Sequence, residues 1–156
     1  MLHLIPAPLH RLVLRLAYAI RHKRRQHGGK ARDGVTIVAR DFQGQVLLVR
    51  HSYGPAEWFF PGGGIVSGET PEAAAHRELR EETDCEVSAM RHVATFEETL
   101  SGAAHTAHLF EGVTEDMPRA DGREVIEARF FPTHSLPEPL SPRTRERLKM
   151  WQARKS

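Results

Sequence analysis

The hydrophobic positions of this chain change period along its length, from the alternation typical of strands to the spacing typical of helices. The turn residues 41–44 separate two strand-like runs, and Ser101 and Gly102 separate another two. Beyond residue 33 the strand signals dominate. Runs rich in β-branched and aromatic residues, bounded by turn residues, predict strands at 35–39, 45–51 and 58–60, within 86–99 and 104–114, and at 124–131.

Two helices are predicted between and after these strands. Thr70 is suited to cap a helix, and Pro71 fits its first position, where a missing N–H costs nothing. Pattern and charge continue this helix to about Thr83. Ser141 and the proline after it open a second helix, which includes Leu148 and Trp151.

The first 33 residues differ from the rest and are predicted to form an amphipathic helix followed by a basic linker at 22–33. The linker separates this segment from one compact domain at 34–156. The helix has three possible partners: its own domain, a second subunit in a homodimer, or, less favoured, an anionic membrane surface. We expect it to lie outside the catalytic machinery. Its apolar positions, with Arg11 and Arg15 off the stripe, are Leu9, Leu12, Val13, Leu16, Ala17 and Ile20.

Composition narrows the class of protein. The chain has 156 residues, of which 40% are hydrophobic and 27% charged, as expected for one globular domain. A net charge of +2 is too small to indicate a stable nucleic-acid partner. Cys85 is the only cysteine, which excludes an intrachain disulfide and favours a reducing, cytoplasmic location. No apolar run approaches membrane-spanning length, and the dense positive charge follows the first apolar stretch instead of preceding it, unlike a cleaved signal.

Three glutamates of the first helix lie on one face. Glu78, Glu81 and Glu82 are three and four residues apart, a spacing at which like charges cost roughly 0.2–0.5 kcal/mol per pair. Arg77 can offset one of them, and a hard divalent cation can offset all three. The alternative is a solvated acidic face paired with Arg77 and Arg80. The glycine loop, residues 61–64, favours the cation, because it lets the backbone approach a ligand closely.

The same segment resembles the Nudix family, whose box reads G-x5-E-x7-R-E-U-x-E-E-x-G-U, with U a bulky aliphatic residue. Asp84 and Cys85 depart from the last two positions. We expect Asp84 to reach the left-handed conformation that glycine would adopt there, and Cys85 to fill the aliphatic site. The residues that match in register are Gly63, Glu69, Arg77, Glu78, Leu79, Glu81 and Glu82.

The resemblance implies an α/β/α sandwich with a mixed sheet and a site for Mg²⁺ or Mn²⁺. By resemblance Glu78 and Glu82 are metal ligands, Glu81 is a third ligand or orients water, and the Gly62 carbonyl completes the shell. Arg77 would orient a neighbouring glutamate, and Glu69 would brace the loop. A further glutamate from outside the box often serves as base or ligand, and the candidates here are Glu124 and Glu127, with exposed loop glutamates as the alternative.

The implied reaction is hydrolysis of a phosphoanhydride bond in a nucleoside diphosphate linked to another group. Arg50, His51, Tyr53 and Trp58 precede the glycine loop and are candidates to contact that small-molecule substrate, although Trp58 and Phe59 also suit a core. The rival function is a binding module that senses a nucleotide without cleaving it. A zinc site at His105 and His108 is disfavoured, since residues three apart on a strand point to opposite faces.

Overall fold

The computed structural model describes residues 8–9, 33–100 and 102–154. The predicted N-terminal helix and linker, with their possible contacts to the domain, a second subunit or a membrane, therefore fall almost wholly outside the described residues. In the described part, no helix is long and apolar enough to cross a membrane. The elements are β1 (Gly34–Arg40), β2 (Val46–His51), β3 (Trp58–Phe59), β4 (Gly62–Gly64), α2 (Pro71–Thr83), β5 (Ser88–Leu100), β6 (Ala103–Val113), β7 (Val125–Phe131) and α3 (Pro142–Ala153).

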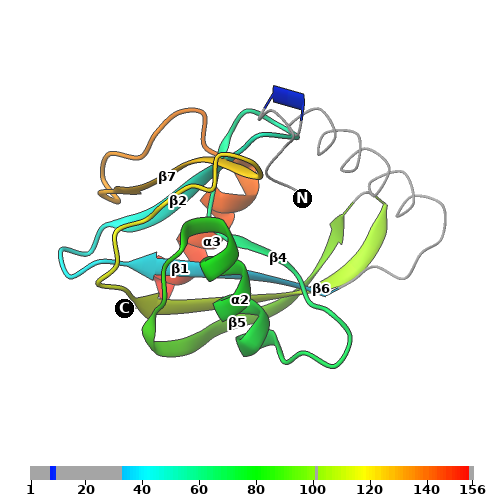
Figure 1. Cartoon of the computed structure of the whole chain (residues 1–156). Helices are drawn as coiled ribbons and strands as arrows, with labels where there is room; N and C mark the ends of the chain where they lie inside the picture. Colours follow the sequence, from blue (N-terminus) through cyan, green and yellow to red (C-terminus); the bar gives the residue numbers. More distant parts are fainter. Residues whose placement is uncertain (1–7, 10–32, 101, 155–156) are drawn as a thin grey trace.

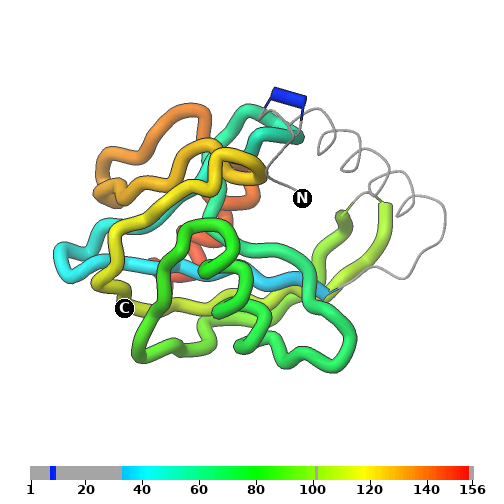
Figure 2. The backbone as a smooth tube through the Cα atoms, viewed as in Figure 1, coloured from blue at the N-terminus to red at the C-terminus, as the bar shows by residue number. Residues whose placement is uncertain are grey.

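The strands form one mixed sheet, as predicted. Its main order is β3-β2-β1-β6-β5, with β4 added beside β1 and β7 beside β2. The β1–β6 pair is parallel and runs from Gly34 opposite Ala107 to Arg40 opposite Val113, whereas the other pairs are antiparallel. Figures 1 and 2 show β1 as the central strand, with α2 over one face of the sheet and α3 behind the other.

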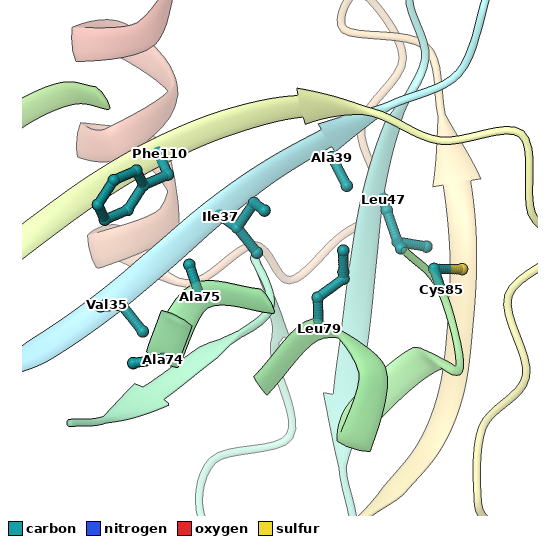
Figure 3. Close-up of a cluster of buried hydrophobic side chains, with 9 residues drawn as sticks. All are labelled: Val35, Ile37, Ala39, Leu47, Ala74, Ala75, Leu79, Cys85 and Phe110. Carbon is teal, nitrogen blue, oxygen red and sulfur yellow. The ribbon is translucent and has the colours of Figure 1, made fainter. Parts of the chain in front are cut away.

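Each face of the sheet has its own hydrophobic core. On the α2 face, Ala74, Ala75 and Leu79 pack onto Ile37 and Leu47, and all five side chains are fully buried (Figure 3). On the α3 face the cluster comprises Val38, Val46, Leu48, Trp58, Phe60, Leu109, Leu140, Leu148 and Trp151. Alternating residues of β1 and β2 therefore supply both layers, which is the period that a sheet buried on both faces requires. The predicted α/β/α sandwich is confirmed.

The two histidines of the H-x-x-H sequence lie on opposite faces of β6, as expected. Leu109 belongs to the α3 core and Phe110 to the α2 core, so His105 faces α3 and His108 faces α2. His105 is buried and its Nε2 lies 2.6 Å from Glu98 Oε1. His108 contacts Thr95 instead, with 3.2 Å between Nδ1 and Oγ1. The two rings serve separate polar contacts.

Helix α2 begins and ends as the sequence predicts. The Thr70 hydroxyl accepts a hydrogen bond from the Ala73 amide at 3.2 Å, and Pro71 occupies the first turn. At the other end Asp84 is left-handed, with φ 58° and ψ 27°, and its N–H donates to the Arg80 carbonyl. Cys85 is fully buried in the α2 core, in the place of the aliphatic residue.

The left-handed Asp84 gives a stability prediction. Asp84→Gly should leave the free energy of unfolding unchanged or raise it by up to about 1 kcal/mol, because glycine has no Cβ penalty there. Asp84→Val should lower it by about 1–2 kcal/mol, since a β-branched residue fits this region badly. Urea unfolding of both variants measures the difference. A Val variant as stable as the parent would show that this helix end relaxes to ordinary φ.

Candidate active site

Two residues of the glycine loop, Gly62 and Gly63, lie close to atoms of neighbouring elements. A Cβ on Gly62 would overlap the carbonyl oxygen of Val35 on the paired strand β1. A Cβ on Gly63 would overlap the carboxylate of Glu78. The missing side chains therefore let β4 pair with β1 on one side and leave room for a carboxylate of α2 on the other. In the sequence, the run of three consecutive glycines is the signal of these two close approaches.

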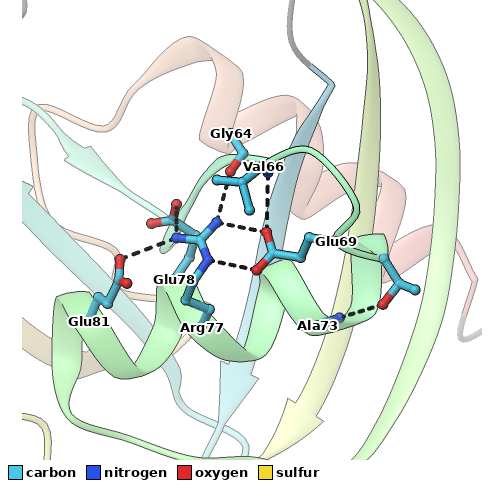
Figure 4. Close-up of polar contacts among 8 residues, drawn as sticks. Gly64, Val66, Glu69, Ala73, Arg77, Glu78 and Glu81 are labelled. Carbon is cyan, nitrogen blue, oxygen red and sulfur yellow. Dashed lines mark hydrogen bonds and ion pairs between the residues drawn. The ribbon is translucent and has the colours of Figure 1, made fainter.

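Arg77 joins the loop to the helix. Its guanidinium donates to both oxygens of Glu69, at 2.8 and 2.9 Å, and to the Gly64 carbonyl at 3.0 Å (Figure 4). Its remaining nitrogen, Nη1, donates to Glu78 at 3.0 Å and to Glu81 at 3.2 Å. The hydrogen bonds that Arg77 donates lower the pKa of the Glu69 carboxyl. The same contact with Glu69 raises the pKa of the Arg77 guanidinium. Arg77 thus contacts the glutamates and Glu69 contacts the loop, the arrangement that the resemblance implies.

The planar guanidinium of Arg77 makes paired hydrogen bonds to Glu69 and Gly64, which the single ammonium group of a lysine cannot reproduce. Arg77→Lys keeps the charge and loses the paired contacts to Glu69 and Gly64, so the free energy of unfolding should fall by about 1–3 kcal/mol. The matched control is Arg80→Lys, because within residues 33–100 and 102–154 the exposed Arg80 side chain has a single ion pair, to the exposed Glu86 at 3.6 Å. That change should stay within about 0.5 kcal/mol. Equal effects of the two changes in chemical denaturation would contradict this role of Arg77.

Glu82 and Glu78 form a carboxylate pair in which Glu82 is buried and Glu78 is half-buried. The Glu82 side chain is 5% exposed and that of Glu78 15%, in contrast to 54% for Glu81. Burial raises the pKa of Glu82 well above its usual range, and the charge of Glu78 raises it further. Burial also raises the pKa of Glu78, against the opposing effect of Arg77. The low exposure of the Glu82 and Glu78 side chains argues against a solvated acidic face, the alternative that the sequence left open for them.

One oxygen of Glu82 has no hydrogen-bond partner. Oε1 accepts from the Gly62 amide at 3.2 Å, while Oε2 is buried and unpaired throughout the part of the chain that the structure describes. A buried carboxylate oxygen without a partner is costly, because it has lost water and gained nothing in exchange. In their charged forms Glu78 and Glu82 repel each other and are poorly solvated, as the raised pKa values of both carboxyls reflect, and a cation would offset that charge.

His51 stands across from this oxygen. Its Nε2 lies 4.0 Å from Glu82 Oε2. The rings of Tyr53 and Phe59 lie beside it, with centroids 5.2 and 5.6 Å away. Burial lowers the pKa of His51, opposed by the backbone of Glu124 and the charge of Asp121. The sequence grouped His51 with substrate contacts and gave no signal that it faces a box glutamate.

Arg50 and Trp58 lie away from the carboxylate pair. Trp58 is 7% exposed and packs edge-on against Phe131 in the α3 core, which is the core position that the sequence left open as the alternative to a substrate contact. Arg50 lies over the Trp58 ring and forms an ion pair with Glu127, its neighbour across β2 and β7. Because side chains alternate along a strand, Arg50 and His51 point to opposite faces of the sheet.

The two outer glutamates therefore have different surroundings. Glu127 is paired with Arg50, whereas the charge of Glu124 raises the pKa of both Glu78 and Glu82. Glu124 is exposed and immediately precedes β7, and its carbonyl accepts from the Ser52 amide at 2.9 Å. Of the two candidates, Glu124 is the one whose charge reaches the buried pair.

The residues present fit a hard divalent cation. No three His, Cys, Asp or Glu side chains in the described ranges are grouped to hold a metal unaided. Mg²⁺ needs no such group, because it keeps several waters and is bound through one or two carboxylates. The half-buried Glu78 and the buried Glu82, with the unpaired Oε2 and the close glycine backbone, supply that donor set.

Solved structures with the same fold come from several bacteria and an archaeon. The MutT Nudix hydrolase of Burkholderia pseudomallei is 23% identical, covers 78% of this chain and 98% of its own, and has a TM-score of 0.70. The Nudix domain of Shewanella oneidensis NrtR, solved with ADP ribose, is 18% identical, covers 84% and 92%, and has a TM-score of 0.72. The MutT protein of Methanosarcina mazei has a TM-score of 0.70 at 21% identity, covering 81% and 97%. At these identities the likeness shows the fold.

Sequence comparison gives a shorter and closer match. The RNA pyrophosphohydrolase of Yersinia enterocolitica is 55% identical over 51 residues, which is 33% of this chain and 29% of that protein. The match thus spans less than a third of the relative. The family model described as the NUDIX domain matches residues 30–151. Because that model covers most of the chain and the box residues assemble one site, this chain belongs to the Nudix hydrolase family.

Proposed function

We propose that the protein is a Mg²⁺- or Mn²⁺-dependent pyrophosphohydrolase, which cleaves a phosphoanhydride bond in a nucleoside diphosphate linked to another group. The products would be a nucleoside monophosphate or another phosphorylated fragment. The observation that carries this proposal is the buried, unpaired Oε2 of Glu82 next to Glu78. A protein that only binds a nucleotide has no need for two carboxylates held out of water at this cost.

The residues would divide the work as follows. Glu78 and Glu82 would hold the cation, with the Gly62 carbonyl or Glu81 completing its shell. The cation supplies positive charge against the phosphate oxygens and acidifies water. Arg77 holds Glu78 and Glu81 in place and ties the helix to Gly64. Glu124 would accept a proton from the attacking water, because its charge reaches the buried pair.

The substrate class has two leads. The short match to RNA pyrophosphohydrolase favours a terminal phosphoanhydride at the 5′ end of RNA, as a second candidate beside a free nucleotide. The structure with ADP ribose belongs to a domain of the same fold at 18% identity and adds a small molecule to the test set. On a net charge of +2 we expect no stable nucleic-acid partner, so an RNA substrate would be held at its end only.

One assay separates these possibilities. Purified protein is incubated with Mg²⁺ or Mn²⁺ and a panel of nucleoside diphosphate sugars, dinucleoside polyphosphates, nucleoside triphosphates and a 5′-triphosphorylated oligonucleotide. Release of a monophosphate or of pyrophosphate that stops with chelator supports the proposal and identifies the bond cleaved. Tight binding of a panel member without any turnover, with either metal, would instead establish a nucleotide-sensing module.

A further inference from the structure

His51 faces the unpaired oxygen of Glu82 at a distance that suits two ligands of one ion. The 4.0 Å between His51 Nε2 and Glu82 Oε2 is too long for a hydrogen bond. Two donors that each lie about 2.1 Å from one cation can be at most about 4.2 Å apart. The separation therefore leaves room for a cation between the two atoms and excludes a direct hydrogen bond.

The surroundings of His51 hold its ring in this orientation. The imidazole is 17% exposed and lies against the rings of Tyr53 and Phe59. His51 is the last residue of β2, and the pairing of β2 with β7 shifts in register between Arg50 and His51. The ring is thus placed by strands outside the box helix. A surface histidine would pay side-chain entropy to be held against a carboxylate, whereas this ring is already fixed by packing.

We infer that His51 is a nitrogen ligand of the metal in this site, paired with Glu82 across the ion. This inference rests on the proposed function, since it concerns the same cation. Imidazole favours later transition ions such as Co²⁺ and Ni²⁺, whereas an all-oxygen shell favours Mg²⁺. A site in which His51 faces Glu82 across the ion should therefore bind Co²⁺ more tightly, relative to Mg²⁺, than the same site without the imidazole.

Pulsed electron paramagnetic resonance of the Mn²⁺-loaded full-length protein tests the nitrogen ligand directly. The expected result is a nitrogen coupling to Mn²⁺ that changes to the ¹⁵N pattern when the protein is made with ¹⁵N-labelled histidine. This measurement uses the unaltered chain, so it does not depend on the folding of any variant. Mn²⁺ bound without a histidine coupling would overturn the inference and leave the proposed function standing if hydrolysis is measured. Failure of the protein to bind Mn²⁺, together with no hydrolysis in the presence of Mg²⁺ or Mn²⁺, would overturn both.

A variant pair measures the metal preference. His51→Gln should lose the coupling and lower Co²⁺ affinity by roughly 10–100-fold, with a smaller change for Mg²⁺, in calorimetric titrations. The matched control is His134→Gln, an exposed loop histidine, which should keep the coupling and both affinities. If His51→Gln instead keeps the coupling and raises only the KM for the nucleotide, His51 contacts the substrate and the inference is wrong.

Discussion

Replacing Glu82 with glutamine should lower turnover at least about 100-fold at saturating Mg²⁺, because the change removes the charge and keeps the size of a side chain proposed to hold the metal. The variant should be no less stable than the parent in the absence of metal. In the metal-free protein, Glu82 is a buried carboxylate with one unpaired oxygen, and a neutral amide loses less on burial than a charge. Loss of activity together with retained stability separates a functional carboxylate from a structural one.

Glu86→Gln provides the matched control for that experiment. Glu86 lies just beyond the same helix, has a side chain that is 74% exposed, and forms a long ion pair with the exposed Arg80. Its loss should leave turnover and thermal stability near those of the parent. Steady-state kinetics and thermal melts of both variants decide the matter, and wild-type turnover in Glu82→Gln would remove Glu82 from the metal site.

The second large effect is expected at Glu124. If this carboxylate is the general base, Glu124→Gln should lower kcat by roughly 10²–10⁴ while the metal affinity changes little. The comparison is Glu127→Gln, because Glu127 is held in an ion pair by Arg50, whereas the charge of Glu124 raises the pKa of Glu78 and Glu82. Glu127→Gln should keep most of the turnover.

Rapid-mixing kinetics with a fixed, saturating metal concentration distinguishes the two glutamates. A Glu127 variant that loses more turnover than the Glu124 variant would reverse the assignment. Near-normal kinetics in both would place the base on Glu81 or on another residue near the pair.

The box helix was predictable because its signals are local. A cap at Thr70, a proline in the first turn and three glutamates on one face depend only on neighbours within a few residues. The left-handed end at Asp84 followed from the same reasoning, since it is a property of one residue and its position. Except for β4, the strands were predictable from alternation and from turn residues, to within one or two residues at their ends. Strand β4 was expected only as a glycine loop, because three glycines carry no strand pattern.

The relations between strands were not predictable from such signals. The ion pair of Arg50 with Glu127 depends on the register of two strands far apart in sequence. The approach of His51 to Glu82 requires a strand end, a helix face and the packing of two aromatic rings to be known together. The burial of Trp58 was weighed correctly as the alternative to a substrate contact, but composition alone could not choose between them, because tryptophan suits both a core and a binding surface.

The parallel pairing of β1 with β6 has a consequence for how the protein folds. β1 meets β2 only at Arg40 and Val46, and its long partner β6 arrives about 70 residues later in the chain. At synthesis rates of roughly 5–20 residues per second, β6 is synthesised roughly 4–15 s after β1, and until then much of the apolar surface of β1 is uncovered. The high sequence separation of this contact also slows refolding of the finished chain. Substitutions that weaken the β1–β6 pair, such as Leu109→Ala, should therefore reduce the yield of folded protein by aggregation of partly folded chains, even where the glycine loop and the box helix are untouched.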